Sequence, residues 1–165
     1  MTWIRRVSLL GAAVACSAAV SSAGATTATK PIPGFRSPTR NISCLFVPAS
    51  YDDIGHPLQA LLLCSIGKAS YAARLQDGCL NPNGAKGAGV DWHGWSLNPT
   101  RKGSIVCSGG ILYNSNKFTP SYVTLAYGKT MHHDGMTCTS RISGVTCSNS
   151  RGHGLFVSRR SWRVW

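Results

Sequence analysis

The chain has 165 residues, with 17 lysines and arginines against five acidic residues, and its formal net charge at pH 7 is +12. All five acidic residues are aspartates, which argues against a ribonuclease mechanism that pairs glutamate with histidine. A net charge of this sign favours anionic partners but does not select their chemistry.

The first residues have the features of a secretory signal peptide. Arg5 and Arg6 precede an uncharged, alanine-rich run, and Ala23-Gly24-Ala25 fits a small-x-small cleavage site. We therefore interpret residues 1–25 as a signal peptide that is removed on export. The apolar run is too short for a good membrane span, so we expect no transmembrane segment after cleavage. Cleavage before Cys16 would instead produce a lipoprotein.

Signal cleavage removes two of the arginines and leaves a formal net charge of +10, from fifteen basic and five acidic residues. Residues 26–34, TTATKPIPG, lack apolar periodicity and contain two prolines, which predicts a flexible leader. We expect residues 35–165 to form a single secreted β-rich domain, since their number is typical of one domain.

Six cysteines remain after cleavage, and in an exported domain they predict three disulfides. Cys138 and Cys147 flank a turn ending at Gly144, so we predict that they face each other across a hairpin, within disulfide reach. Gly144 would supply positive φ there. The other four cysteines leave alternatives open, of which nearest-neighbour pairing is preferred. It joins Cys44 to Cys64 and Cys79 to Cys107.

Short clusters of β-branched and aromatic residues recur between Gly, Pro, Asn and Ser, which is typical of an all-β domain. The strand candidates are Ile42–Val47, Ile105–Cys107, Tyr122–Tyr127, Met136–Thr139, Val145–Ser148 and Leu155–Ser158. The predicted fold is mainly β. We expect a small disulfide-stapled antiparallel sheet, barrel-like or sandwich-like, with at most one short helix.

Three segments between these candidates have other patterns. Leu58–Cys64 fits either a buried strand or a helical turn. Ala69–Gln76 predicts a short helix with Ser70 as its N-cap and Gly78 just past its end. Asn81–Gly89 is rich in Gly and Asn, which predicts a surface loop.

The C-terminal segment predicts two short strands. Leu155 and Val157 share one face of an extended strand, whereas Trp162 and Val164 have the opposite parity. A bulge or bend near Arg159-Arg160 would return both pairs to a common core.

The same segment carries the strongest charge signal, because four of the fifteen basic residues lie in the last fifteen positions beside two tryptophans. Arginine binds anions through forked hydrogen bonds, while tryptophan can stack on a sugar or a base. We therefore predict an anion-binding surface made of Arg151, His153, Arg159, Arg160, Trp162 and Arg163.

Candidates for carboxylate or metal chemistry are few. Asp52 and Asp53 are adjacent and would point to opposite faces of a strand, which disfavours a glycosidase pair. Asp91 with His93, and the run His132-His133-Asp134, group metal-ligand residue types without a third well-placed ligand. We expect no metal and no cofactor, and assign no catalytic residue.

Four blocks of the sequence carry a family resemblance: Phe35-x-Ser37-Pro38-x-x-Asn41-Ile42-x-Cys44, Tyr127-Gly128, Cys138 through Gly144-Val145-Thr146-Cys147, and Gly152-His153-Gly154-x-Phe156-x-Ser158-Arg159. They resemble the signatures of small exported actinobacterial proteins that form a domain of unknown function. The resemblance spans about residues 35–165. It implies secretion, disulfides and a small β-rich fold, and it supplies no catalytic residues. Arg40 departs from it, because glycine is expected there and positive φ would strain an arginine.

We expect a secreted binding or structural protein that contacts anionic cell-surface or wall polymers through a basic face. Lipid head groups and nucleic acid are also eligible partners. One alternative is a small secreted hydrolase, such as a ribonuclease using His133 and His153. Another is an inhibitor or partner-protein module that presents loop 81–89. The sequence specifies no oligomeric state.

Overall fold

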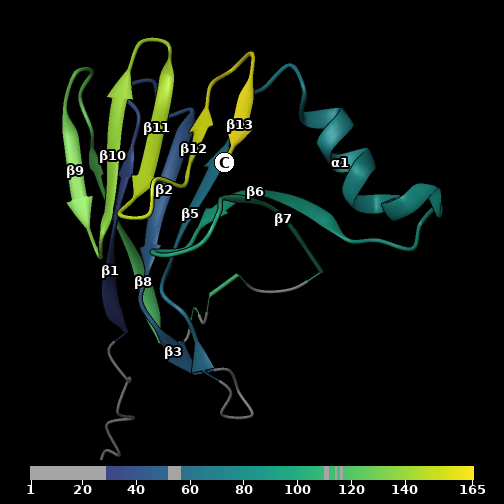
Figure 1. Ribbon diagram of the computed structural model, residues 1–165, viewed down its shortest axis with the longest axis horizontal. Helices are drawn as coiled ribbons and strands as arrows, with labels where there is room; N and C mark the ends of the chain where they lie inside the picture. The colour runs from purple at the N-terminus through teal and green to yellow at the C-terminus, as the bar shows by residue number, and fades with distance from the viewer. Residues whose placement is uncertain (1–28, 52–56, 110–111, 114, 116) are drawn as a thin grey trace, which may run out of the picture.

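Two β-sheets pack face to face, and one helix lies beside them (Figure 1). The structure, a computed structural model, describes residues 29–51, 57–109, 112–113, 115 and 117–165. The predicted signal peptide, residues 1–25, lies outside the described residues, as do Cys16, Asp52 and Asp53. Among the described residues, no helix is long and apolar enough to cross a membrane.

The first sheet has six strands in the order β7-β6-β5-β2-β1-β8, and the second has five in the order β13-β12-β11-β10-β9. The first comprises β1 (Lys30–Arg36), β2 (Ile42–Val47), β5 (Leu61–Ile66), β6 (Asp91–Leu97), β7 (Ser104–Ser108) and β8 (Phe118–Thr124). The second comprises β9 (Thr130–His133), β10 (Met136–Arg141), β11 (Gly144–Asn149), β12 (Gly154–Val157) and β13 (Trp162–Val164). Smaller elements are β3 (Ser50–Tyr51), β4 (Pro57–Leu58), the helix α1 (Ala72–Leu80) and the 3₁₀ turn η1 (Pro82–Gly84).

The core lies between the two sheets. Successive side chains of a strand point to opposite faces, and apolar side chains line the faces at which the sheets meet. In β2, Cys44 and Phe46 face this core, whereas Leu45 and Val47 belong to a smaller apolar cluster with Ile32. The predicted mainly β, disulfide-stapled fold is confirmed, and its form is a sandwich.

Three disulfides fasten the fold, and they join the pairs preferred from the sequence. Cys44–Cys64 links β2 to β5, Cys138–Cys147 links β10 to β11, and Cys79–Cys107 links α1 to β7. The first two lie in the core, and the sulfur atoms of Cys44, Cys64 and Cys147 lie within 4.8 Å of one another. The cysteine pairs indicate an extracellular or otherwise oxidising environment.

Strand β1 corrects the prediction of a flexible leader from Lys30 onward, because Lys30–Arg36 pair in parallel with β8 and Ile32 is buried. The first part of that predicted leader, residues 26–28, lies outside the described residues. The N–H of Lys30 donates to the Lys117 carbonyl. The even-numbered residues of β1 therefore point their backbone N–H and C=O groups toward β8. Pro31 and Pro33 therefore face the β2 side, where pairing begins only at Gly34. Prolines fit a strand at such an unpaired edge.

Other boundaries differ from the predictions. Helix α1 begins at Ala72 after Tyr71, with no side-chain cap from Ser70, and it continues through Gly78. The segment Leu58–Cys64 contributes to strands and not to a helix, as β4 and β5 show. Strand β8 ends at Thr124, earlier than the predicted Tyr122–Tyr127 strand, because its pairing with β1 ends there.

The C-terminal segment forms two strands, as predicted, and a bend at Arg159 and Arg160 joins them. Leu155 and Val157 are fully buried, and Trp162 and Val164 pack against the same core. A Cβ atom added at Gly154 would lie 2.4 Å from the Cys147 carbonyl oxygen. Gly154 therefore allows a close backbone approach, which is a structural role.

The three disulfides should differ in their sensitivity to reductant. Cys107 is exposed, whereas all four cysteines of the other two disulfides are fully or almost fully buried. Because thiol–disulfide exchange requires access to a sulfur, a mild reductant should open Cys79–Cys107 first. Alkylation followed by peptide mapping should label Cys79 and Cys107 while the strand signal in circular dichroism persists. Equal labelling of all six cysteines would contradict this expectation.

Candidate functional site

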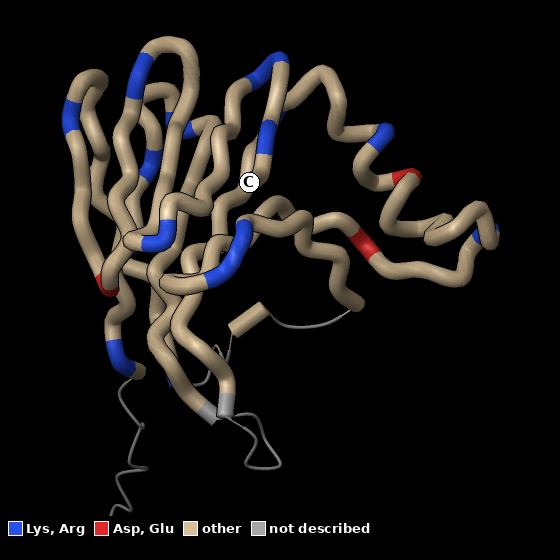
Figure 2. The backbone as a smooth tube through the Cα atoms, in the orientation of Figure 1, with Lys and Arg blue, Asp and Glu red and all other residues tan. Residues whose placement is uncertain are grey.

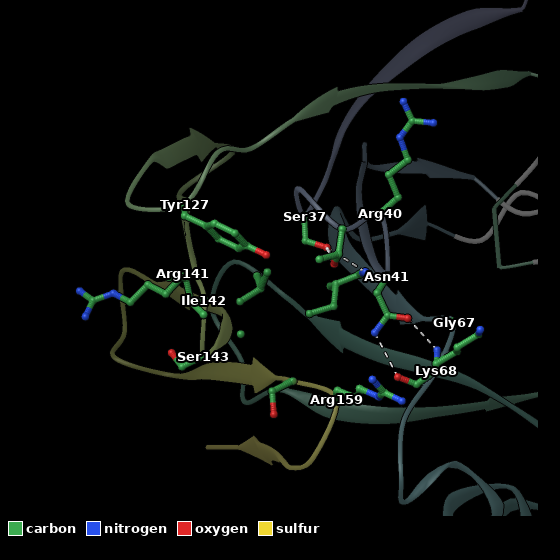
Figure 3. Close-up of a pocket in the computed structure, with 15 residues that line it drawn as sticks. Ser37, Arg40, Asn41, Gly67, Lys68, Tyr127, Arg141, Ile142, Ser143 and Arg159 are labelled. Carbon is green, nitrogen blue, oxygen red and sulfur yellow. Dashed lines mark hydrogen bonds between the residues drawn. The ribbon is translucent and has the colours of Figure 1, made fainter.

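Turns from both sheets surround a cavity of about 550 Å³ at one end of the sandwich (Figure 3). Strand directions bring five turns to this end, since β1, β5, β8, β10 and β12 all finish there. We call it the basic end and define it by residues 37–41, 67–70, 126–129, 141–144 and 158–161. All five turns contribute to the cavity or pack directly behind its lining.

The β1–β2 turn forms one wall of the cavity. The Ser37 carbonyl accepts the N–H of Arg40 at 2.7 Å, and the Ser37 hydroxyl accepts the N–H of Ile42 at 3.1 Å. This tight closure puts Arg40 in the left-handed region, with φ of 57°. The strain expected at Arg40 is therefore present, since glycine adopts this conformation without steric cost.

Asn41 joins that wall to the segment after β5. Its side-chain N–H donates to the Lys68 carbonyl at 3.0 Å, and its side-chain oxygen accepts the Lys68 N–H at 2.8 Å (Figure 3). Its backbone carbonyl also accepts the N–H of Gly67 at 2.8 Å. Two of these hydrogen bonds reach Lys68 and the third reaches its neighbour Gly67, so Asn41 holds Lys68 at the edge of the cavity.

Tyr71 connects the same segment to the second sheet. Its hydroxyl donates to the Ser158 carbonyl at 2.6 Å, and the N–H of Ser70 donates to the Arg159 carbonyl at 3.0 Å. Burial raises the pKa of the Tyr71 phenol to about 12, so it remains a donor at neutral pH. The Ser158 hydroxyl accepts the N–H of Ser161 at 3.1 Å, which closes the turn that carries Arg159.

The β10–β11 hairpin supplies the opposite wall. Its loop is two residues long, Ile142 and Ser143, and Gly144 follows with φ of 144°, as the sequence predicts. Ile142 is 87% exposed at the tip. Tyr127 extends across the cavity toward Ser37 (Figure 3) and is also exposed.

Four cations surround the mouth of this cavity: Arg40, Lys68, Arg141 and Arg159. Arg40 and Arg141 extend outward from its centre, so the charges form a rim (Figure 3). The four side chains make no ion pair or hydrogen bond with any other described residue, and no acidic residue occurs among the five turns. Lys and Arg gather at this end while the acidic residues in view lie elsewhere (Figure 2).

The six residues of the predicted anion-binding surface do not form one surface. Arg159 and Arg160 lie at the basic end, whereas Arg151 and His153 lie in the turn at the other end of β12. Trp162 packs against the core, and Arg163 stacks over Trp165 with 4.7 Å to its ring centroid. Only Arg159 of the six lines the cavity.

The chain also brings together cations that sequence reasoning missed. Lys68 and Arg141 lie far from Arg159 in sequence, and their meeting depends on which strands end together. Of the cations other than Arg159, Arg40 is the one that the sequence singles out, because it stands where the family resemblance leads one to expect a glycine.

The groups considered for metal or acid–base chemistry have structural contacts. The Asp91 carboxylate accepts a hydrogen bond from Gln76 at 2.8 Å, and His93 lies at a bulge, its ring 2.9 Å from the Ser108 carbonyl oxygen. His133 packs against the Phe46 ring. In the part of the chain that the structure describes, the one cluster of metal-ligand types is Cys44, Cys64 and Cys147, which are held in disulfides.

His132 and His133 are successive strand residues, so they alternate in direction and do not converge with Asp134 on one point. His133 lies 3.4 Å from the Asp134 carboxylate, while His132 contacts Thr137 at 2.9 Å. No contact among the described residues joins the His133 and His153 side chains. The ribonuclease alternative therefore stays a prediction.

A family model described as "Family of unknown function (DUF6636)" matches residues 10–164. The chain belongs to this family. The match covers nearly the whole sequence and includes every turn of the basic end. Neither the curated proteins nor the solved structures contain a match to the chain. Family membership thus agrees with the resemblance seen in the sequence and leaves the activity open.

Replacing Arg40 with glycine should stabilise the fold by about 1 kcal/mol, because glycine tolerates positive φ and the backbone hydrogen bond to Ser37 is retained. Urea unfolding measures this change. Arg40→Gln is the matched control, because it removes the charge and keeps the strain, so its stability should stay near that of the wild type. Equal stabilisation by both variants would assign the effect to charge repulsion.

Tyr71 should make stability depend on alkaline pH. The folded-state pKa of about 12 exceeds the unfolded value of about 10, so the stabilisation is complete below pH 10 and is lost as pH rises toward 12. Tyr71→Phe should cost about 1 to 2 kcal/mol at neutral pH, since the Ser158 carbonyl loses its donor. The difference in unfolding free energy between wild type and variant should shrink above pH 10. A constant difference up to pH 12 would contradict the assignment.

Proposed function

We propose that this protein is a secreted binding protein whose basic end holds an anionic group of a cell-surface component. One observation carries the proposal, namely that four cations without a described partner surround a single cavity. Uncompensated like charges repel one another, so their gathering lowers stability unless a ligand of opposite sign occupies the site. Wall polymers, lipid head groups and other phosphate- or carboxylate-bearing components all have that charge.

The residues around the cavity suit recognition of oxygen-rich anions. Arg141 and Arg159 can each present a planar fork of N–H donors to a phosphate or carboxylate, and Lys68 adds a point charge. Ser37 and Ser143 offer hydroxyls within the lining, and the Tyr127 ring can lie against a ligand's apolar or sugar face. The cations and the neutral hydroxyls can all donate hydrogen bonds to the oxygen atoms of an anion.

Binding is favoured over catalysis by what the lining contains. Among the described residues that line the cavity there is no His, Asp, Glu or Cys. The lining does offer Ser, Lys and Tyr, but it lacks the imidazole and carboxylate groups that most often serve as the general base for a hydroxyl nucleophile. The described lining therefore supports a binding role.

Two independent features of the chain support the proposal of export. Three disulfides require an oxidising compartment, and the N-terminal residues have the pattern of a cleaved signal peptide. The net charge then faces the anionic components of a cell surface. Secretion and anion binding together define the proposed role.

The proposal can be tested with polyphosphate as a soluble probe. The triple variant Lys68→Gln, Arg141→Gln, Arg159→Gln should bind polyphosphate roughly tenfold or more weakly than the wild type, since three charge-assisted contacts are lost. Its affinity should also depend less steeply on salt, because fewer counterions are released. Titration by fluorescence or calorimetry across a salt series measures both quantities.

The matched control is Arg101→Gln, Lys102→Gln, Arg151→Gln. It removes the same net charge from the opposite end of the sandwich, where Asn149 bonds to the Arg101 carbonyl and to the N–H of Arg151. We expect this control to bind polyphosphate nearly as well as the wild type. Equal weakening in both triple variants would show that binding follows net charge and not the cavity, and would overturn the proposed site.

A further inference from the structure

The tip of the β10–β11 hairpin places an apolar side chain where turns usually place small polar ones. Two-residue hairpin loops favour Gly, Asn, Asp and Ser, yet the first loop position here is Ile142. At 87% exposure, Ile142 is the most exposed of the large hydrophobic residues among those described. Its β-branched side chain contributes nothing to the core at that position.

This exposed isoleucine is not isolated on a neutral surface. Tyr127, 42% exposed, lines the cavity of the basic end and also a second, more open hollow, whose lining includes Ile142 and Arg141. The surrounding turns carry cations and no carboxylate. Protein surfaces that bind the interface of an anionic bilayer typically combine an apolar residue, an aromatic residue and surrounding cations. The hairpin tip and its neighbours have this composition.

The hairpin is also held rigidly enough to present its tip. The Cys138–Cys147 disulfide closes the hairpin three residues from Arg141 and Gly144. The N–H of Gly128 donates to the Ser140 carbonyl at 2.7 Å, which fixes the Tyr127 turn against the hairpin close to its tip. The apolar tip therefore loses little conformational freedom when it enters an apolar phase.

We propose that the basic end docks on the surface of a membrane containing anionic lipid, with Ile142 inserted at the headgroup–acyl boundary and a lipid phosphate in the cavity. The cavity part of this inference rests on the proposed anion-binding function. A soluble polyanion would satisfy Arg141 and Arg159 and leave Ile142 in water, whereas a lipid surface accommodates the cations and the apolar tip together. Charge complementarity and the exposed tip thus select the lipid source of phosphate over the polymer.

The test compares vesicles with the soluble probe. The wild-type protein should sediment with vesicles of phosphatidylcholine containing about one part in three of phosphatidylglycerol, and much less with phosphatidylcholine alone. Ile142→Ser, which suits the turn, should lower the ratio of vesicle affinity to polyphosphate affinity by about tenfold. Ile142→Trp should keep or raise that ratio, because tryptophan favours the membrane interface. Leu58→Ser, at an exposed apolar residue on β4, is the matched control and should leave the ratio unchanged.

The outcomes separate the two proposals. Polyphosphate binding without vesicle binding, or a ratio that Ile142→Ser leaves unchanged, would overturn membrane docking while the anion site stands. Equal loss of the ratio in Ile142→Ser and Leu58→Ser would also overturn it. If the triple variant at the cavity and the triple control variant lost vesicle binding to the same degree, the cavity would not be part of the docking surface. Absence of binding to either probe would overturn the anion site itself.

Discussion

The packing of two disulfides against each other in the core constrains the rest of the structure. Cys44–Cys64 fixes the register of β2 against β5, and Cys138–Cys147 fixes that of β10 against β11. Because the sulfurs of the two sheets meet, the sheets are also set relative to each other. A shift of register by one residue would turn these buried sulfurs outward, so the placement of the turns follows from the covalent bonds.

The basic end depends on this constraint because its cations come from turns that only the correct registers bring together. Arg40 occupies a backbone conformation that costs an L-residue roughly 1–2 kcal/mol, and no acidic neighbour offsets the charge around the cavity. Such local costs are tolerated where the surrounding structure is overdetermined. Disulfides of this size contribute about 3 kcal/mol each on the chain-entropy model, enough to offset them. Strain and unpaired charge gather at the cavity, as they do at many functional sites.

The sequence predicts local relations well and distant ones poorly. The Cys138–Cys147 hairpin follows from a short turn and alternating residues, and the two C-terminal strands follow from a change of parity. The parallel pairing of β1 with β8 joins segments separated by most of the chain, and no local pattern encodes it. For the same reason, the C-terminal run of arginines draws attention to Arg159, whereas no local pattern draws attention to Lys68. Charge density along the chain differs from charge density on the folded surface.

The prolines of β1 have a consequence for contacts between molecules. Pro31 and Pro33 lie on the β2 side of β1, before the pairing with β2 begins at Gly34, where an ordinary strand would present N–H groups to any extended chain nearby. Without those donors, this stretch of backbone cannot template the addition of a foreign strand. The feature that resembled a loose leader in the sequence is therefore one that disfavours edge-to-edge aggregation of a sheet-rich protein.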